Sequence, residues 1–272
     1  MGFLILSGVA LLVAFWLASE PAITARRRRK IAQAPFPPEW RAILRSRVPY
    51  FRRLPTSLQL RLKRQINVFI AEKPFVGCNG LIVTDEMRVV VAAQACLLTL
   101  SRPDYYFPSV TQILLYPSAF ITTREQADQH GLLMTKQTAL NGESWTHGQV
   151  ILSWPDVLHG AAIDNDGSNL VIHEFAHQLD QEKGYANGAP SLLNRKRIRN
   201  WTSVLTNEFN ALQERASMNE DSLFSYYGAT NPAEFFAVVS EVFFEQPQLM
   251  SEQHPCLFRE FKTFYRLNPL AW

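Results

Sequence analysis

The stretch Leu170-Val-Ile-His173-Glu174-Phe-Ala-His177-Gln-Leu-Asp180 combines two histidines with apolar residues at helical spacing. On an α-helix, residues four positions apart share one face, so His173 and His177 would point the same way. Two imidazoles held in this way can bind one Zn²⁺, and Glu174 lies beside them, within reach of a metal-bound water. The pattern therefore predicts a helix that carries two metal ligands and a general base.

A catalytic zinc site needs a third protein ligand, because the fourth position stays open for water. Among the downstream acids, Glu234 and Glu241 lie in an apolar stretch, where burying a lone carboxylate is unfavourable. A zinc ion would offset that cost, which favours Glu234 as the ligand and Glu241 as the second choice. Glu234 also follows Asn231-Pro232 closely enough to complete a helix-capping box instead.

Three further residues in or beside the two motifs have expected roles: Glu174, Tyr227 and Asp180. Glu174 would take a proton from the attacking water and pass it to the leaving amine. Tyr227, just ahead of the Glu234 segment, is the expected hydrogen-bond donor to the charge that develops on the substrate. Asp180 could orient an imidazole or could simply end the helix. Two further histidines lie in polar stretches and are expected at the surface: His130 and His147.

Charge is distributed unevenly along the 272 residues, although the formal net charge is only +3. The first 64 residues hold 13 of the 27 Lys and Arg and two of the 24 acids, so an acidic body follows a basic stem. A nucleic-acid binder would instead carry its basic groups on the folded surface, so we expect no nucleic-acid partner. The three cysteines form no C-x-x-C pair, which fits a reducing compartment.

The N-terminal segment carries no charge from Gly2 to Ser19 and is mostly apolar. About 18 such residues approach the length of a membrane-spanning helix. Basic residues follow the segment at positions 26–30 and none precedes it, which favours a cytoplasm-facing anchor over a cleaved signal peptide or a buried or interfacial helix. We therefore expect residues 1–19 to form a single-pass anchor in the inner (cytoplasmic) membrane. The basic stem would also attract anionic membrane lipid.

Residues 20–54 are expected to form a basic, proline-rich linker, because several prolines argue against a long helix there. Apolar spacing then predicts helices over residues 56–72, 87–100 and 192–215, one after Asn231-Pro232, and a last amphipathic one. Strands are expected at residues 110–116, 133–140 and 149–154. We therefore expect the soluble domain to begin near residue 55.

Two segments resemble the bacterial Mlc titration factor A family: His173-Glu-Phe-Ala-His-Gln-Leu-Asp180 and Tyr227-Gly-Ala-Thr-Asn-Pro-Ala-Glu234-Phe-Phe-Ala-Val-Val-Ser-Glu241. A looser likeness covers about residues 55–270, including Leu114-Leu-Tyr-Pro117 and Asn141-Gly-Glu-Ser-Trp145. The resemblance implies a gluzincin-type peptidase with a catalytic core similar to that of anthrax lethal factor. It implies an α+β fold, with a mostly helical, zincin-like metallopeptidase domain over residues 55–272 and a small sheet. The transmembrane helix expected at residues 1–19 would precede this domain. It also implies that Glu234 is the third zinc ligand, that Tyr227 flanks the metal, and that an edge strand at residues 149–154 could pair with an extended peptide.

The resemblance implies a zinc-dependent peptidase with one Zn²⁺ per chain that acts on a peptide or protein, as an aminopeptidase or an endopeptidase. The family's soluble namesake binds the Mlc repressor, and this sequence departs from it at the N-terminus, where an apolar segment and a basic stem stand. One alternative is a regulatory protein that binds a transcriptional repressor, with a non-catalytic or structural zinc site. Another is a zinc hydrolase for a different substrate. Retention of Glu174 favours an enzyme, because zinc binding alone needs no general base.

Overall fold

The fold is described from a computed structural model of the chain. It describes residues 19–118, 120–127, 133–140, 142–145, 148–184, 186–191 and 194–272. The expected anchor at residues 1–19 therefore lies, apart from Ser19, outside the described residues, as do His130 and His147. Within the described ranges, no helix has the length and apolar character to cross a membrane.

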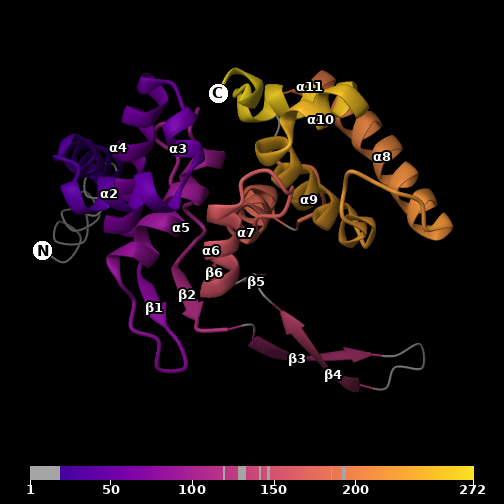
Figure 1. Cartoon of the computed structure of the whole chain (residues 1–272), viewed down its shortest axis with the longest axis horizontal. Helices are drawn as coiled ribbons and strands as arrows, with labels where there is room; N and C mark the ends of the chain where they lie inside the picture. Colours follow the sequence, from indigo (N-terminus) through magenta and orange to yellow (C-terminus); the bar gives the residue numbers. More distant parts are fainter. Residues whose placement is uncertain are drawn as a thin grey trace, which may run out of the picture.

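Helices make up most of the described chain (Figure 1). They are α2 Pro38–Arg47, α3 Tyr50–Arg53, α4 Thr56–Glu72, α5 Asp85–Leu98, α6 Trp154–Ala162, α7 Leu170–Asp180, α8 Arg195–Met218, α9 Pro232–Glu245, α10 Pro247–Gln253 and α11 Pro255–Tyr265. Residues 19–33 are also helical, and short 3-10 turns occur at η1 Gln181–Lys183, η2 Tyr226–Ala229 and η3 Pro269–Ala271. The helix predicted over residues 56–72 coincides with α4.

A small four-stranded sheet has the order β1-β2-β6-β5. Its strands are β1 Phe75–Gly77, β2 Gln112–Tyr116, β6 Gln149–Ser153 and β5 Gly142–Trp145. The first three are parallel, and β5 runs antiparallel to β6. A separate antiparallel pair consists of β3 Phe120–Ala127 and β4 Leu133–Leu140. The predicted α+β class, mostly helical with a small sheet, is confirmed.

The prediction that residues 149–154 form an edge strand is wrong. β6 is hydrogen-bonded to β2 on one side and to β5 on the other, so it lies inside the sheet. Its burial agrees with this position, because Val150 and Leu152 are completely buried. Among the described strands the outer one on this side is β5, whose backbone lies close to α7.

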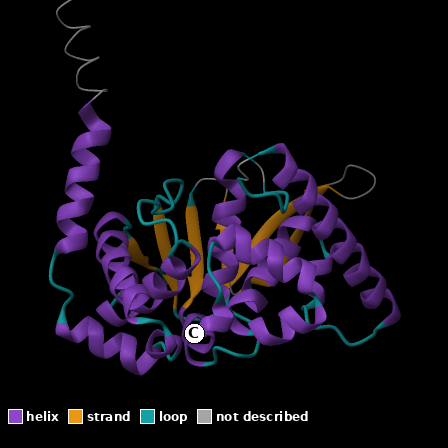
Figure 2. Ribbon diagram, turned by 90° about the horizontal axis from the view of Figure 1, so that it is seen from above, coloured by secondary structure: helices purple, strands orange, loops and turns teal. Residues whose placement is uncertain are grey.

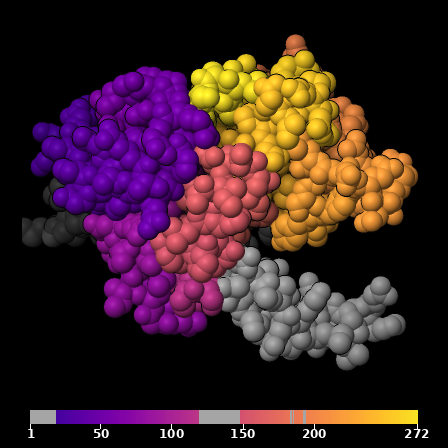
Figure 3. Space-filling model, viewed as in Figure 1, coloured from indigo at the N-terminus to yellow at the C-terminus, as the bar shows by residue number. Residues whose placement is uncertain are grey.

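The core is centred on α5, which packs against α2, α4, α6 and α7. Its side chains are buried from Val89 to Leu98, which is typical of a helix that is apolar on all sides. In Figure 3 the segment that contains β6, α6 and α7 lies between the N-terminal and C-terminal parts of the chain. This central position brings α7 into contact with α5 on one side and with α9 on the other.

Residues 20–54, expected to form a linker, are largely helical instead: residues 20–33 belong to the N-terminal helix, and α2 and α3 follow. The prolines permit this because they lie at helix starts: Pro37, Pro49 and Pro55 are the N-cap residues of α2, α3 and α4. Proline is tolerated in that position, where the missing N–H has no helical partner. Apolar side chains of this segment join the core, and they are Leu44, Val48, Tyr50, Phe51 and Leu54.

Candidate metal site

The helix that carries the His-Glu-x-x-His pattern begins at a well-formed cap. Asn169 accepts a hydrogen bond from the Ile172 N–H at 3.0 Å. Its side-chain amide donates to Gly160 O at 2.9 Å, which ties the start of α7 to α6. The cap therefore fixes where α7 begins and, with it, the direction in which His173 and His177 point.

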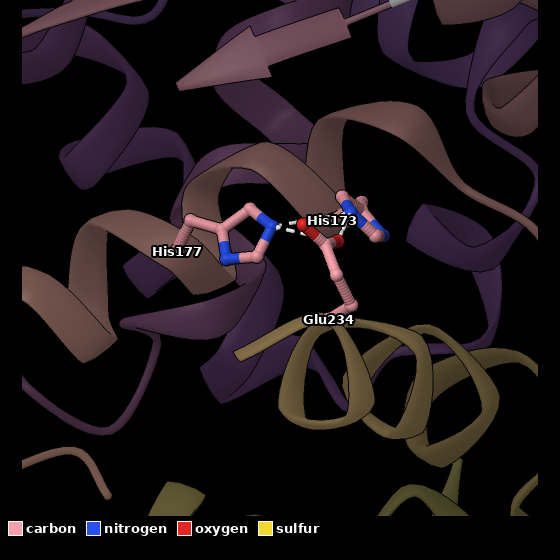
Figure 4. A group of neighbouring side chains, drawn as sticks. All are labelled: His173, His177 and Glu234. Carbon is pink, nitrogen blue, oxygen red and sulfur yellow. Dashed lines mark hydrogen bonds and ion pairs between the residues drawn. The ribbon is translucent and has the colours of Figure 1, made fainter. Parts of the chain in front are cut away.

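Three side chains from two helices converge at one point (Figure 4). His173 and His177 come from α7, one turn apart, and their Nε2 atoms lie 3.2 Å from each other. Oε2 of Glu234, from α9, lies 3.0 Å from Nε2 of His173 and 3.2 Å from Nε2 of His177. Two imidazole nitrogens and a carboxylate oxygen grouped in this way could hold one metal ion.

Glu234 owes its position to the first turn of α9. Asn231 caps this helix, and its Oδ1 accepts hydrogen bonds from the backbone N–H groups of Ala233 at 2.9 Å and of Glu234 at 3.0 Å. Pro232 occupies the first helical position, as predicted. Because α9 packs directly on α7, the Glu234 side chain reaches the histidines instead of closing a capping box.

Glu241 lies two turns further along α9 and contacts the other side of the His173 ring. The Nδ1–H of His173 donates to Oε1 of Glu241 at 2.8 Å. This hydrogen bond engages Nδ1, so Nε2 is the ring nitrogen that faces His177 and Glu234. Of the two acids considered as third ligand, the structure brings Glu234 to the ligand cluster and gives Glu241 the outer ring nitrogen.

A second carboxylate that sequence reasoning missed, Glu245, holds the same helix start. Its Oε2 accepts hydrogen bonds from the backbone N–H groups of Gly167 and Ser168, both at 3.1 Å. Oε1 accepts from the Asn169 side-chain amide at 3.0 Å, while Glu241 accepts from the Asn169 backbone N–H. The spacing of Glu241 and Glu245, one turn apart in an apolar helix, was the available signal. Carboxyl oxygens in this position satisfy N–H groups at the start of a helix that have no partner within the helix.

Glu174 and Tyr227 lie next to the ligand cluster. Glu174 is buried on α7, between the two histidines in sequence, with 4% of its surface exposed. Tyr227, in η2, is 53% exposed, and its ring centroid lies 5.8 Å from that of His173. The roles expected for these two residues beside a metal stay predictions.

Asp180 stabilises the loop that follows α7. Its Oδ2 accepts a hydrogen bond from the Gly188 N–H at 2.7 Å. Gly188 has φ of +74°, and a Cβ there would lie 2.4 Å from Pro232 O, so only glycine fits against the start of α9. Asp180 thus holds the loop that packs beside the Glu234 helix.

The protonation states of the cluster reflect its charges. Burial would raise the pKa of Glu234, but hydrogen bonds from His173 and His177 outweigh it and hold the pKa at about 2. Burial would likewise lower the pKa of His173, yet the nearby carboxylates of Glu241 and Glu234 raise it well above the usual value. The cluster therefore keeps Glu234 ionised, which is the state in which it binds a metal.

A His-Glu-x-x-His helix with a carboxylate from a following helix is the ligand arrangement typical of the metallopeptidase class. A family model described as glucose-regulated metallo-peptidase M90 matches residues 22–266. The chain is 33% identical over 259 residues to Mlc titration factor A of Yersinia pestis, covering 94% of this chain and 90% of that protein. An uncharacterized protein of Synechocystis sp. is 38% identical over 245 residues, covering 90% and 89%. The chain belongs to the Mlc titration factor A family of metallopeptidases.

Proposed function

We propose that this protein is a zinc-dependent peptidase that hydrolyses peptide bonds, with His173, His177 and Glu234 as its metal ligands. The observation that carries the proposal is the convergence of these three ligand atoms within 4.8 Å of one another, beside the buried Glu174. An acid positioned next to a metal site but outside the ligand set is what metal-assisted hydrolysis requires.

The ligand geometry fits zinc. Zinc bonds to nitrogen and oxygen are about 2.0–2.1 Å long, so two ligands of a tetrahedral zinc ion lie about 3.3 Å apart. The three atom pairs in the cluster are separated by 3.0 to 3.2 Å. The hydrogen bond from His173 Nδ1–H to Glu241 also leaves the correct ring nitrogen available.

When bound there, zinc would lower the pKa of a water molecule to about 7 and polarise a substrate carbonyl. Glu174 would accept the proton of the attacking water and pass it to the nitrogen of the leaving amine. Tyr227 would donate a hydrogen bond from its hydroxyl to the substrate oxygen on which negative charge develops. Glu241 would hold the His173 ring in one orientation throughout.

The substrate would bind along β5. This strand has β6 on one side, and in the described sheet its other side has no partner strand. An extended peptide could add to such an edge through backbone hydrogen bonds. The backbone of β5 lies close to α7, so a peptide paired with it would lie near the ligand cluster.

Peptide cleavage by the full chain tests the proposal. We expect the purified protein to cleave members of a peptide library, to lose activity on chelation and to regain it with added zinc. Glu174→Gln should lower the cleavage rate at least about 100-fold, because general-base catalysis contributes about 10²–10⁴-fold. Zinc content should stay unchanged in this variant. Cleavage that survives both chelation and Glu174→Gln would rule the mechanism out.

The uncharged segment from Gly2 to Ser19 supports a further part of the proposal: a single-pass anchor in the cytoplasmic membrane, with the peptidase domain in the cytoplasm. Cell fractionation should then find the chain in the inner membrane, protected from protease added outside. Recovery of the chain in the soluble fraction would contradict the anchor and leave the peptidase proposal standing.

The name of the Yersinia relative, Mlc titration factor A, favours a second candidate function, which is binding of a transcriptional repressor. The two functions are separable in the Glu174→Gln variant. A repressor-binding protein would retain its partner in a pull-down when cleavage is lost. A chain that binds neither zinc nor any repressor would contradict both candidates.

A further inference from the structure

A surface cavity of about 840 Å³ lies between the N-terminal helix and α4, far along the chain from the metal ligands. One face of the helix at residues 19–33 lines it, through residues 20, 21, 24, 25, 28, 29 and 32. One face of α4 lines the opposite side, and Pro103, Asp104 and Tyr106 complete the lining. Figure 2 shows the N-terminal helix running from the upper left toward the body of the protein. The cavity has the size of a small-molecule site.

The N-terminal helix is fixed against the body, so the cavity has defined walls. Arg28 makes a two-pronged ion pair with Glu72 at the end of α4, with Nε and an amino nitrogen within 3.1 Å of the carboxylate oxygens. The guanidinium carbon of Arg28 also lies 5.0 Å from the centre of the Tyr106 ring. Asn67 adds a hydrogen bond to Ala34 O at 3.1 Å.

Three arginines in the lining keep their charge available for a ligand. They are Arg29, Arg61 and Arg64, and no carboxylate of the described residues forms an ion pair with any of them. Arg61 makes one neutral contact, a hydrogen bond to Leu100 O at 3.2 Å. The lining contains two acids, Glu20 and Asp104, so positive charge predominates once Arg28 is paired with Glu72. The cavity therefore favours an anion.

The lining is not uniformly polar. Leu60 projects from α4 with 46% of its surface exposed, and Pro21, Ala25 and Ala32 lie across from it on the N-terminal helix. A free phosphate ion would leave this apolar surface in contact with water. An anion attached to a short apolar portion would cover this surface and remove it from water, which is favourable.

We propose that this cavity binds the phosphate-bearing head group of an anionic phospholipid. Glu20, at one end of the lining, directly follows the uncharged segment that ends at Ser19. At 1.5 Å per residue, the lining extends only about 18 Å along the helix from that point. That the cavity lies near a membrane rests on the proposed membrane anchor. The positive charge and the apolar surface of its lining do not depend on the anchor.

Thermal unfolding of the full chain in uncharged detergent micelles tests the proposal. The probes are dihexanoyl phosphatidylglycerol, dihexanoyl phosphatidylcholine and inorganic phosphate at matched concentrations. We expect phosphatidylglycerol at ten times its half-saturating concentration to raise the unfolding temperature by about 4 °C. Phosphatidylcholine and phosphate should have much smaller effects.

The triple variant Arg29→Gln/Arg61→Gln/Arg64→Gln should lose the response to phosphatidylglycerol. Its matched control removes the same number of charges from the exposed face of α8, through Arg195→Gln/Lys196→Gln/Arg199→Gln, and should keep it. An equal response in both variants, or an equal effect of phosphatidylcholine, would overturn the proposal. An equal effect of inorganic phosphate would assign the cavity to a free anion and overturn it as well. Cell fractionation tests the proposed membrane anchor separately. The unfolding measurement does not depend on its result.

Discussion

His173 is the residue on which the site depends most, because both of its ring nitrogens are engaged. Nε2 faces Glu234 and His177, while Nδ1–H donates to Glu241. The sequence alone predicts His173, Glu174 and His177, since one helix fixes their spacing. It also singles out Glu234 and Glu241 as acids in an apolar stretch. Their division of roles depends on how α9 sits on α7, which no local pattern specifies.

Replacing Glu241 with glutamine tests its orienting role. The variant removes the charge that holds His173 Nδ1–H, so zinc affinity should fall about 10- to 100-fold in a competition assay with a chelator. Glu260→Gln is the control, because Glu260 is a similarly buried carboxylate that pairs with Arg197 on α8. Equal zinc affinity in the wild type and the Glu241→Gln variant would show that Glu241 does not support the ligand.

At the scale of elements, α7 and α9 together build the site, and the start of each is set by an asparagine cap. The sequence indicates the cap at Asn231, because Pro232 follows it and is favoured at the first position of a helix. The prediction of β6 as an edge strand failed because strand order depends on pairing between distant segments. The prediction of a linker from the prolines of residues 35–55 failed because proline is common both in linkers and at the start of a helix.

Removing the α9 cap should weaken metal binding more than removing an equivalent cap elsewhere. Asn231→Ala leaves the N–H groups of Ala233 and Glu234 without their partner, so unfolding should become easier by about 1 kcal/mol. Asn194→Ala is the matched control, because Asn194 caps α8 through a similar 3.0 Å hydrogen bond from the Arg197 N–H. We expect similar losses of stability in both variants and a lower zinc affinity in Asn231→Ala alone. Equal zinc affinities would contradict a role of this cap in positioning Glu234.

For the molecule as a whole, stability should depend on pH through Glu245, which joins the end of α9 to the start of α7. Burial raises the pKa of Glu245, the hydrogen bond from the Asn169 amide lowers it, and the nearby Asp166 and Glu241 raise it. The resulting pKa is about 9. The folded protein therefore binds one more proton than the unfolded chain between about pH 4.5 and 9. This contribution to stability is complete below about pH 4.5 and is lost as the pH rises toward 9.

Denaturant unfolding between pH 5 and 9, with chelator present, measures this effect. The free energy of unfolding of the wild type, relative to that of Glu245→Gln, should fall with rising pH by up to about 1.4 kcal/mol per unit. Glu214→Gln, at an exposed position on α8, should leave the pH profile unchanged. A constant difference between the wild type and Glu245→Gln would show that Glu245 does not take up a proton on folding.

The proposed peptidase activity depends on a single metal ion that links α7 to α9. Its most direct test is the zinc content of the purified full chain after reconstitution with zinc and removal of the excess. We predict one zinc ion per chain in the wild type and in Glu174→Gln, and little or none in Glu234→Gln. A wild-type chain without zinc, or a Glu234→Gln chain that retains as much zinc as the wild type, would contradict a zinc site formed by His173, His177 and Glu234.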